Sequence, residues 1–241
     1  MVRRSSSLLS FLICFPREAA ILPDTRLRAP RRPHGHECIH GLDETAGLGK
    51  QAKILTDKQV ALALAAVATR RYPIRDRVIV LLSVRAGLRA KEISNIRWSA
   101  VTDAEGAVTD TIHLVNGASK GKRGGREIPM AKDLRQALVE LQAFKRAAPG
   151  DRIIFSERDI GISPKALTIW FLTLYRDLGF KGASSHSGRR TFITKAAKRC
   201  IEGGGSLRDV QQLAGHSSLA TTQRYIEGSS DAKRRIVDLI S

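Results

Sequence analysis

The segment "LAGHSSLATTQRYI", residues 213–226, carries the strongest fold signal in this 241-residue chain. It places His216 in a predicted turn and Tyr225 nine residues later, at the end of a weakly helical run of Ser and Thr. One interpretation is that the Tyr225 ring packs against the protein and leaves its hydroxyl in water, as most tyrosines do. The other is that the hydroxyl oxygen is a nucleophile. This segment alone does not decide between them.

Composition and charge narrow the class of protein. The chain has 41 Lys and Arg against 23 Asp and Glu, which gives a net charge of +18. Such a surplus attracts polyanions, of which nucleic acid is the commonest, and the alternative is a merely solvated basic surface. Three widely spaced cysteines predict no disulfide framework and fit a reducing cytoplasm. No apolar run reaches the roughly 20 residues of a membrane span, so no membrane partner is expected.

The N-terminal segment, residues 1–49, differs from the rest of the chain. It contains seven arginines, no lysine and four of the eight prolines, and it has no periodic apolar pattern. This composition predicts a disordered or non-native N-terminal extension. Its cluster "HGHECIH" has ligand-type side chains, but their alternate spacing matches no structural zinc pattern, and no metal site is predicted. Residues 50–241 are expected to form one folded domain.

Capping signals and apolar periodicity predict the elements of that domain. Thr56 followed by Gln59 is a capping box for a first helix. Its buried stripe is expected to comprise Val60, Leu62, Leu64, Ala65 and Val67. Pro73 suits the first turn of a second helix, and Gly87 suits its C-terminal stop.

Further patterns complete the predicted order of elements. Short strands are expected within 107–115 and 126–130, flanking the Gly- and Lys-rich turn "NGASKGKRGG". Helices are expected at "AKEISNIRW" and at 131–147, 164–178, 187–200, 207–213, 219–226 and 231–240. The predicted class is therefore α+β, a mostly α-helical domain with one small antiparallel β-sheet.

Basic residues stand at the ends of several predicted elements, where side chains can converge on a phosphate. The segment "AGLRAKEI" places Arg89 just past a helix stop, and "HSGRRTF" places His186 and Arg189 on one face of a helix start. Lys120 lies in the turn between the strands. Each signal is weak by itself, because a His and an Arg at helical spacing occur by chance in many chains.

In this order and spacing, the motifs "AGLRAKEI", "SKGKRGGREIPM", "HSGRRTF" and "LAGHSSLATTQRYI" resemble the tyrosine recombinase, or phage integrase, family over roughly residues 53–230. The resemblance implies the DNA breaking-rejoining fold for a catalytic domain at residues 50–241. It implies the following site: two catalytic arginines, Arg89 and Arg189; two histidines, His186 and His216; a hairpin lysine; the nucleophile Tyr225; and Glu92 supporting the first arginine. Lys120 is preferred as the lysine, although Lys122 is also within reach.

The resemblance also implies the partners. Double-stranded DNA is the expected substrate, bound by a protein that is a monomer in solution and a homotetramer on DNA. Basic residues beside the motif positions are expected to contact the DNA: Lys122, Arg123, Arg126, Arg190 and Arg224.

The chemistry of DNA strand transfer requires these side-chain types. The phenol of a free tyrosine has a pKa near 10, so ionising it at pH 7 costs roughly 4 kcal/mol, which a histidine base and nearby guanidinium charge reduce. Two arginines can stabilise the charge that develops on a phosphodiester, so no metal or other cofactor is expected. Two alternatives remain open: a topoisomerase-like nicking-closing enzyme with the same residues, and a degenerate integrase that only binds DNA.

Overall fold

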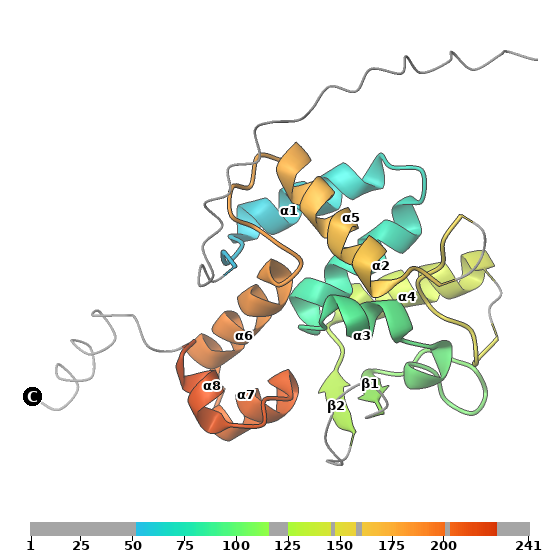
Figure 1. Cartoon of the computed structure of the whole chain (residues 1–241). Coiled ribbons are helices and arrows are strands. Elements are labelled where there is room, and N and C mark those ends of the chain that lie inside the picture. The colour runs from blue at the N-terminus through green and yellow to red at the C-terminus, as the bar shows by residue number, and fades with distance from the viewer. Residues whose placement is uncertain (1–51, 116–124, 146–147, 158–160, 201–202, 226–241) are drawn as a thin grey trace, which may run out of the picture. The chain divides into compact units, whose positions relative to one another are not determined.

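The computed structural model describes residues 52–115, 125–145, 148–157, 161–200 and 203–225 (Figure 1). The chain divides into two units, Met1–Gly47 and Leu48–Ser241, and every described residue belongs to the second. The predicted N-terminal extension at 1–49, with its "HGHECIH" cluster, and the predicted helix at 231–240 lie outside the described residues.

The first helix, α1 (Asp57–Ala68), begins as its capping box predicts. The Thr56 hydroxyl accepts a hydrogen bond from the Gln59 N–H at 3.2 Å, and the Gln59 side chain accepts from the Thr56 N–H at 3.0 Å. The buried face consists of Val60, Ala63 and Val67. The predicted stripe was wrong for Leu62 and Ala65, which are exposed, because the buried positions follow the spacing of i, i+3 and i+7.

The central helix is α2 (Pro73–Arg85), which begins at the predicted proline and packs against α1, α4 (Lys132–Lys145) and α6 (Ser187–Arg199). Contacts on several sides explain why it is buried almost all round (Figure 1). It ends before Gly87, whose φ of +64° lies in the left-handed region that glycine adopts at little cost. That turn leads directly into α3 (Ala90–Asn95).

The sheet is a single antiparallel pair among the described residues, β1 (Thr111–Leu114) and β2 (Arg126–Pro129), with Ile112 opposite Ile128. Both isoleucines are fully buried and belong to the main core. Two further elements surround the main core: the short 3-10 helix η1 (Trp98–Ala100) and helix α5 (Pro164–Asp177), which packs against α3. The prediction of a mostly helical α+β fold is confirmed.

The last described helices, α7 (Leu207–Ala214) and α8 (Leu219–Gln223), form a smaller layer with α6 (Figure 1). A second apolar cluster holds this layer together, with Ile193, Ala197, Val210 and Ala214 as its buried members. The Tyr225 ring packs against this cluster from the chain segment after α8. None of the helices in the described part of the chain is long and apolar enough to cross a membrane.

Candidate active site

A pocket of about 370 Å³ opens between the α2–α3 turn, the N-terminus of α6 and the α7–α8 region. Its lining contains most of the site residues expected from the sequence: Arg89, His186, Arg189, Arg190, His216, Arg224 and Tyr225, together with Ala52 and Thr221. These residues come from segments more than 100 positions apart in the chain. Folding therefore brings three of the four sequence motifs, those that contain Arg89, Arg189 and Tyr225, to one pocket.

Arg89 lies at the N-cap of α3, where Glu92 holds it twice. The Glu92 carboxylate accepts from the Arg89 backbone N–H at 2.7 Å and from its guanidinium Nη1 at 3.0 Å. The Arg89 side chain remains 42% exposed, while that of Glu92 is only 19% exposed. Glu92 thus fixes one edge of the guanidinium and leaves the remainder facing the pocket.

Arg189, on the first turn of α6, is the most deeply buried charge of the pocket, at 6% exposure. It donates hydrogen bonds to two backbone carbonyls, Gly87 at 2.7 Å and Ala214 at 2.5 Å. Burial, and then the positive charge of Arg89, lowers its pKa to about 10. Arg189 still carries its charge at neutral pH, in a place where an anion is favoured.

Close backbone packing seats the α6 N-terminus against α2. Gly188 lies so near Ser83 that any Cβ at this position would collide with the Ser83 hydroxyl. Gly87 lies similarly against the Phe192 ring. The glycines of both motifs therefore set how far Arg189 extends toward the pocket.

His216 lies in the turn between α7 and α8, and two contacts orient its ring. Its Nδ1 is 2.9 Å from the hydroxyl of the buried Thr222, and its ring stacks on that of Tyr225 with 5.7 Å between centroids. Burial, followed by the charges of Arg189, Arg89 and Arg126, lowers the pKa of His216 to about 4. The ring is therefore neutral at physiological pH in the free protein.

Three other predicted residues, His186, Arg190 and Arg224, also line the pocket. His186 is exposed at the N-cap of α6, and Arg224 is exposed beside Tyr225. Arg190 lines the pocket and also donates to the Ala52 carbonyl at 2.8 Å. The hairpin residues Lys120, Lys122 and Arg123 lie outside the described residues.

Arg126, one of the residues expected to contact DNA, is largely buried and bonded to protein. Its side chain is 14% exposed, and both terminal nitrogens bond to protein, one to Glu92 at 3.0 Å and one to the Ala214 carbonyl at 2.6 Å. It is not among the residues that line the pocket. The reason is tertiary: the first residue of β2 lies against the end of α7, and the guanidinium is drawn between two acceptors.

Sequence reasoning missed two members of this network, the Thr222 hydroxyl and the Ala214 carbonyl. Thr222 is six residues after His216, and a Thr at that distance within a turn-plus-helix segment is a usable local signal. The Ala214 carbonyl gives no signal in sequence, because any residue has one. Together with the predicted residues that line the pocket, they form a positively charged site that can receive a phosphodiester.

Comparison with known proteins identifies the family of the chain. The model of the phage integrase family matches residues 53–231. The tyrosine recombinase XerA of Pyrococcus furiosus is 33% identical over 201 residues, which are 78% of this chain and 64% of that protein. The tyrosine recombinase XerC of Pseudomonas aeruginosa is 32% identical over 193 residues, which are 79% and 60%. The chain thus spans less than two thirds of the length of these relatives.

Solved structures show the same fold. The crystal structure of XerA recombinase is similar with a TM-score of 0.61 at 25% identity, over 80% of this chain and 66% of that one. The Tn1549 transposon integrase in complex with circular intermediate DNA reaches 0.63 at 19% identity, over 80% and 68%. The predicted DNA breaking-rejoining fold is confirmed. On the family match and the identity to named relatives, this chain belongs to the phage integrase family, the tyrosine recombinases.

Proposed function

We propose that this protein is a site-specific DNA recombinase that cleaves and rejoins DNA strands through a 3′-phosphotyrosyl intermediate, without metal or ATP. The observation that carries the proposal is the convergence of Arg89, Arg189, His216 and Tyr225 on one pocket. The pocket contains a potential nucleophile, two cations and a neutral hydrogen-bonding ring, which are groups that support transesterification at phosphorus.

In the proposed cleavage step, the Tyr225 oxygen attacks the phosphorus, and the bond from phosphorus to the 5′ oxygen of the next nucleotide breaks. The phenol proton passes to a base, for which the exposed His186 is the candidate. The leaving 5′ oxygen takes a proton from the hairpin lysine, with Lys120 preferred over Lys122. Rejoining is the reverse, with a 5′ hydroxyl attacking the phosphotyrosine.

The arginines and His216 act on the charge that develops on the non-bridging oxygens. The guanidiniums of Arg89 and Arg189 are held by Glu92 and by two backbone carbonyls, so little reorganisation is required when that charge forms. If the Thr222 hydroxyl donates to Nδ1 of His216, the opposite nitrogen carries a hydrogen and can donate to a phosphate oxygen.

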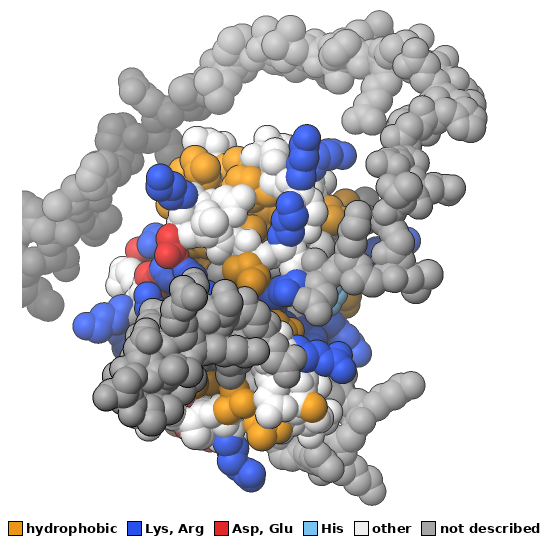
Figure 2. All heavy atoms as spheres, turned by 90° about the vertical axis from the view of Figure 1, so that its left-hand side faces the viewer, with side chains coloured by type: hydrophobic (Ala, Val, Ile, Leu, Met, Phe, Trp, Pro, Cys, Tyr) orange, Lys and Arg blue, Asp and Glu red, His pale blue; other side chains and the backbone are white. Residues whose placement is uncertain are grey.

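The proposed substrate is duplex DNA. Figure 2 shows Lys and Arg side chains spread over the face that it presents, with acidic side chains mainly at one edge of the described surface. The Tn1549 integrase, which has the same fold, is known in complex with DNA. We extend the proposal to a monomer in solution that assembles as a homotetramer on DNA.

The proposal is tested with a nicked suicide duplex taken from the DNA that flanks the gene. The parent protein should form an adduct that resists SDS, at the same rate in EDTA as in Mg²⁺. Tyr225→Phe should bind the duplex with unchanged affinity and form no adduct, because only the nucleophilic oxygen is lost. An adduct of parental yield in Tyr225→Phe would remove this residue from the chemistry. Cleavage that is lost in EDTA and restored by Mg²⁺ would indicate a metal nuclease instead.

A further inference from the structure

Arg126 occupies a position between the two arginines that face the pocket. Its Nη2 shares the Glu92 carboxylate with Arg89: the same Glu92 oxygen accepts from Arg126 at 3.0 Å and from the Arg89 backbone at 2.7 Å. Its Nη1 shares the Ala214 carbonyl with Arg189, at 2.6 Å and 2.5 Å respectively. Arg126 is thus linked through one common acceptor to each of the two.

The two acceptors belong to different parts of the fold. Glu92 is on α3, beside the main core, whereas Ala214 is the last residue of α7 in the smaller layer. Arg126 itself begins β2, the second strand of the hairpin. One side chain therefore joins the hairpin, the helix that holds Arg89 and the turn that carries His216.

The turn after α7 is built against the Arg126 side chain. Gly215 has a φ of +61°, and a Cβ there would collide with the Arg126 guanidinium. The residue after it is His216. Removing Arg126 would leave the Glu92 oxygen and the Ala214 carbonyl with one partner fewer and would free this turn to move.

An arginine suits this position better than a lysine. A planar guanidinium presents two terminal nitrogens in a fixed fork, so it can bond a carboxylate and a carbonyl at once with a defined angle between them. A lysine has one terminal nitrogen on a flexible stem. The positive charge also reaches the pocket, since Arg126 is one of the three arginines that lower the pKa of His216.

We propose that Arg126 is a positioning residue for DNA cleavage, which fixes the Glu92–Arg89 pair and the Ala214–His216 turn relative to each other without touching the DNA. The inference rests on the proposed recombinase function. It differs from the expectation from sequence that Arg126 contacts the DNA. It also differs from a purely structural role, in which only the stability of the fold would depend on the residue.

The structure offers a matched control in Arg75. This arginine is also buried, at 8% exposure, and it also bonds one carboxylate, Asp76 at 2.7 Å, and one backbone carbonyl, Phe155 at 2.9 Å. It does not line the pocket. Arg75→Gln and Arg75→Lys therefore remove the same kinds of bonds as Arg126→Gln and Arg126→Lys, away from the site.

The four variants are compared with the parent in the full-length chain, by single-turnover adduct formation on the suicide duplex, duplex affinity, thermal unfolding and the His216 pKa from NMR. Arg126→Gln should slow adduct formation about 100-fold with affinity unchanged within about threefold, because displacement of catalytic groups by about 1 Å has that effect. Its His216 pKa should rise, since one of three cations is gone. Arg126→Lys should keep the parental His216 pKa and lose about tenfold in rate.

The Arg75 variants should unfold at lower temperature, yet below that temperature they should cleave within about threefold of the parent and leave the His216 pKa unchanged. Parental cleavage by Arg126→Gln or Arg126→Lys would overturn the proposal. So would an equal loss of affinity and rate, which would make Arg126 a phosphate anchor. If the parent itself forms no adduct, the proposed function fails, whereas the His216 pKa still reports whether Arg126 acts on the pocket.

Discussion

Three guanidinium groups, those of Arg89, Arg126 and Arg189, lie around a single carboxylate, that of Glu92. The cluster is therefore short of negative charge before any substrate arrives. Burial and this surplus lower the pKa values of Arg126 and Arg189, because both disfavour additional positive charge. Under the proposed function, a phosphodiester would supply the missing anion and relieve this electrostatic cost on binding.

The lowered pKa of His216 should make the stability of the folded protein depend on pH. Its pKa is about 4 in the folded protein, below the ordinary value of 6.5 that applies in the unfolded chain. Between these values the unfolded chain binds a proton that the folded protein does not, so stability should fall as the pH drops from 6.5 toward 4. Above 6.5 this residue should contribute no pH dependence.

The check is urea unfolding of the parent and of His216→Gln, which is neutral at every pH, from pH 4.5 to 7.5. The difference in unfolding free energy between the two proteins should change across the lower part of this range and be constant above it. A difference that is the same at every pH would show that His216 titrates normally.

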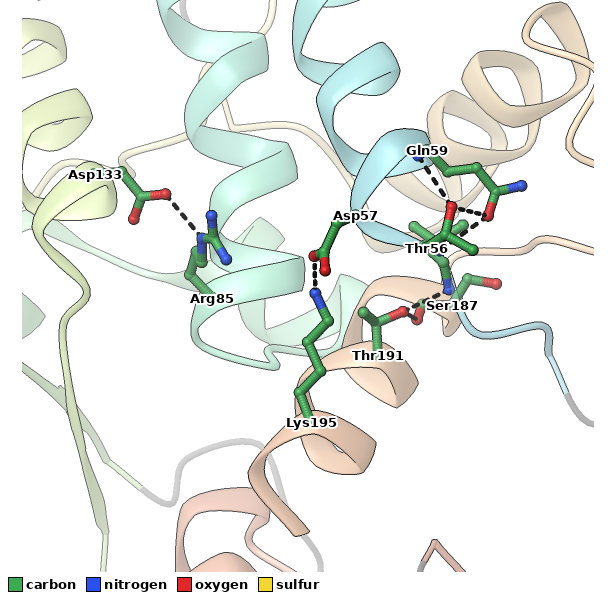
Figure 3. Close-up of polar contacts among 9 residues, drawn as sticks. Thr56, Asp57, Gln59, Arg85, Asp133, Ser187, Thr191 and Lys195 are labelled. Carbon is green, nitrogen blue, oxygen red and sulfur yellow. Dashed lines mark hydrogen bonds and ion pairs between the residues drawn. The ribbon is translucent and has the colours of Figure 1, made fainter. Parts of the chain in front are cut away.

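Helix α6, which carries Arg189, is bonded to the chain around the start of α1 (Figure 3). The Thr191 hydroxyl donates to the Ser187 carbonyl and accepts from the Leu55 N–H, both at 2.8 Å. One turn later, Lys195 pairs with Asp57. A strap of residues 53–57 thus runs along the helix that carries Arg189 and is bonded to it at two levels.

Thr191→Val should destabilise the domain by about 1–3 kcal/mol, because the Leu55 N–H is buried and would lose its acceptor. Thr168→Val on α5 is the matched control, since the Thr168 hydroxyl makes the same bond to a carbonyl four residues earlier, Pro164, and is exposed. It should change the stability by no more than about 0.5 kcal/mol. Equal effects of both substitutions, measured by denaturant unfolding, would mean that the bond from the strap is not what the hydroxyl contributes.

Local signals predicted the elements well, and tertiary packing explains what they missed. The capping box at Thr56, the proline that opens α2 and the turn at Gly87 all appear as expected, since each acts within a few residues. The inward orientation of Arg126 could not be predicted, because its partners lie 34 and 88 positions away. The same holds for Arg75, a buried charged residue that donates to a carbonyl 80 positions away.

At the scale of the whole molecule, most of the net positive charge lies in residues 50–241. The N-terminal 49 residues carry a net +2, so +16 of the +18 belongs to residues 50–241. A surplus of this size attracts any duplex at low salt, whatever its sequence. Within this surplus, the cations that would touch phosphate have to be distinguished from those that only hold the pocket in shape.

Salt dependence makes that distinction measurable. Each phosphate neutralised by a cation contributes about −0.9 to the slope of log affinity against log salt concentration. Arg224 is exposed and lines the pocket, so Arg224→Gln should make the slope shallower by about one unit. Arg126→Gln removes the same charge from a buried position, where both terminal nitrogens bond to protein, and should leave the slope unchanged. Duplex affinity measured between 50 and 300 mM KCl gives both slopes. A parental slope for Arg224→Gln would place that residue off the DNA, and a shallower slope for Arg126→Gln would place Arg126 on it.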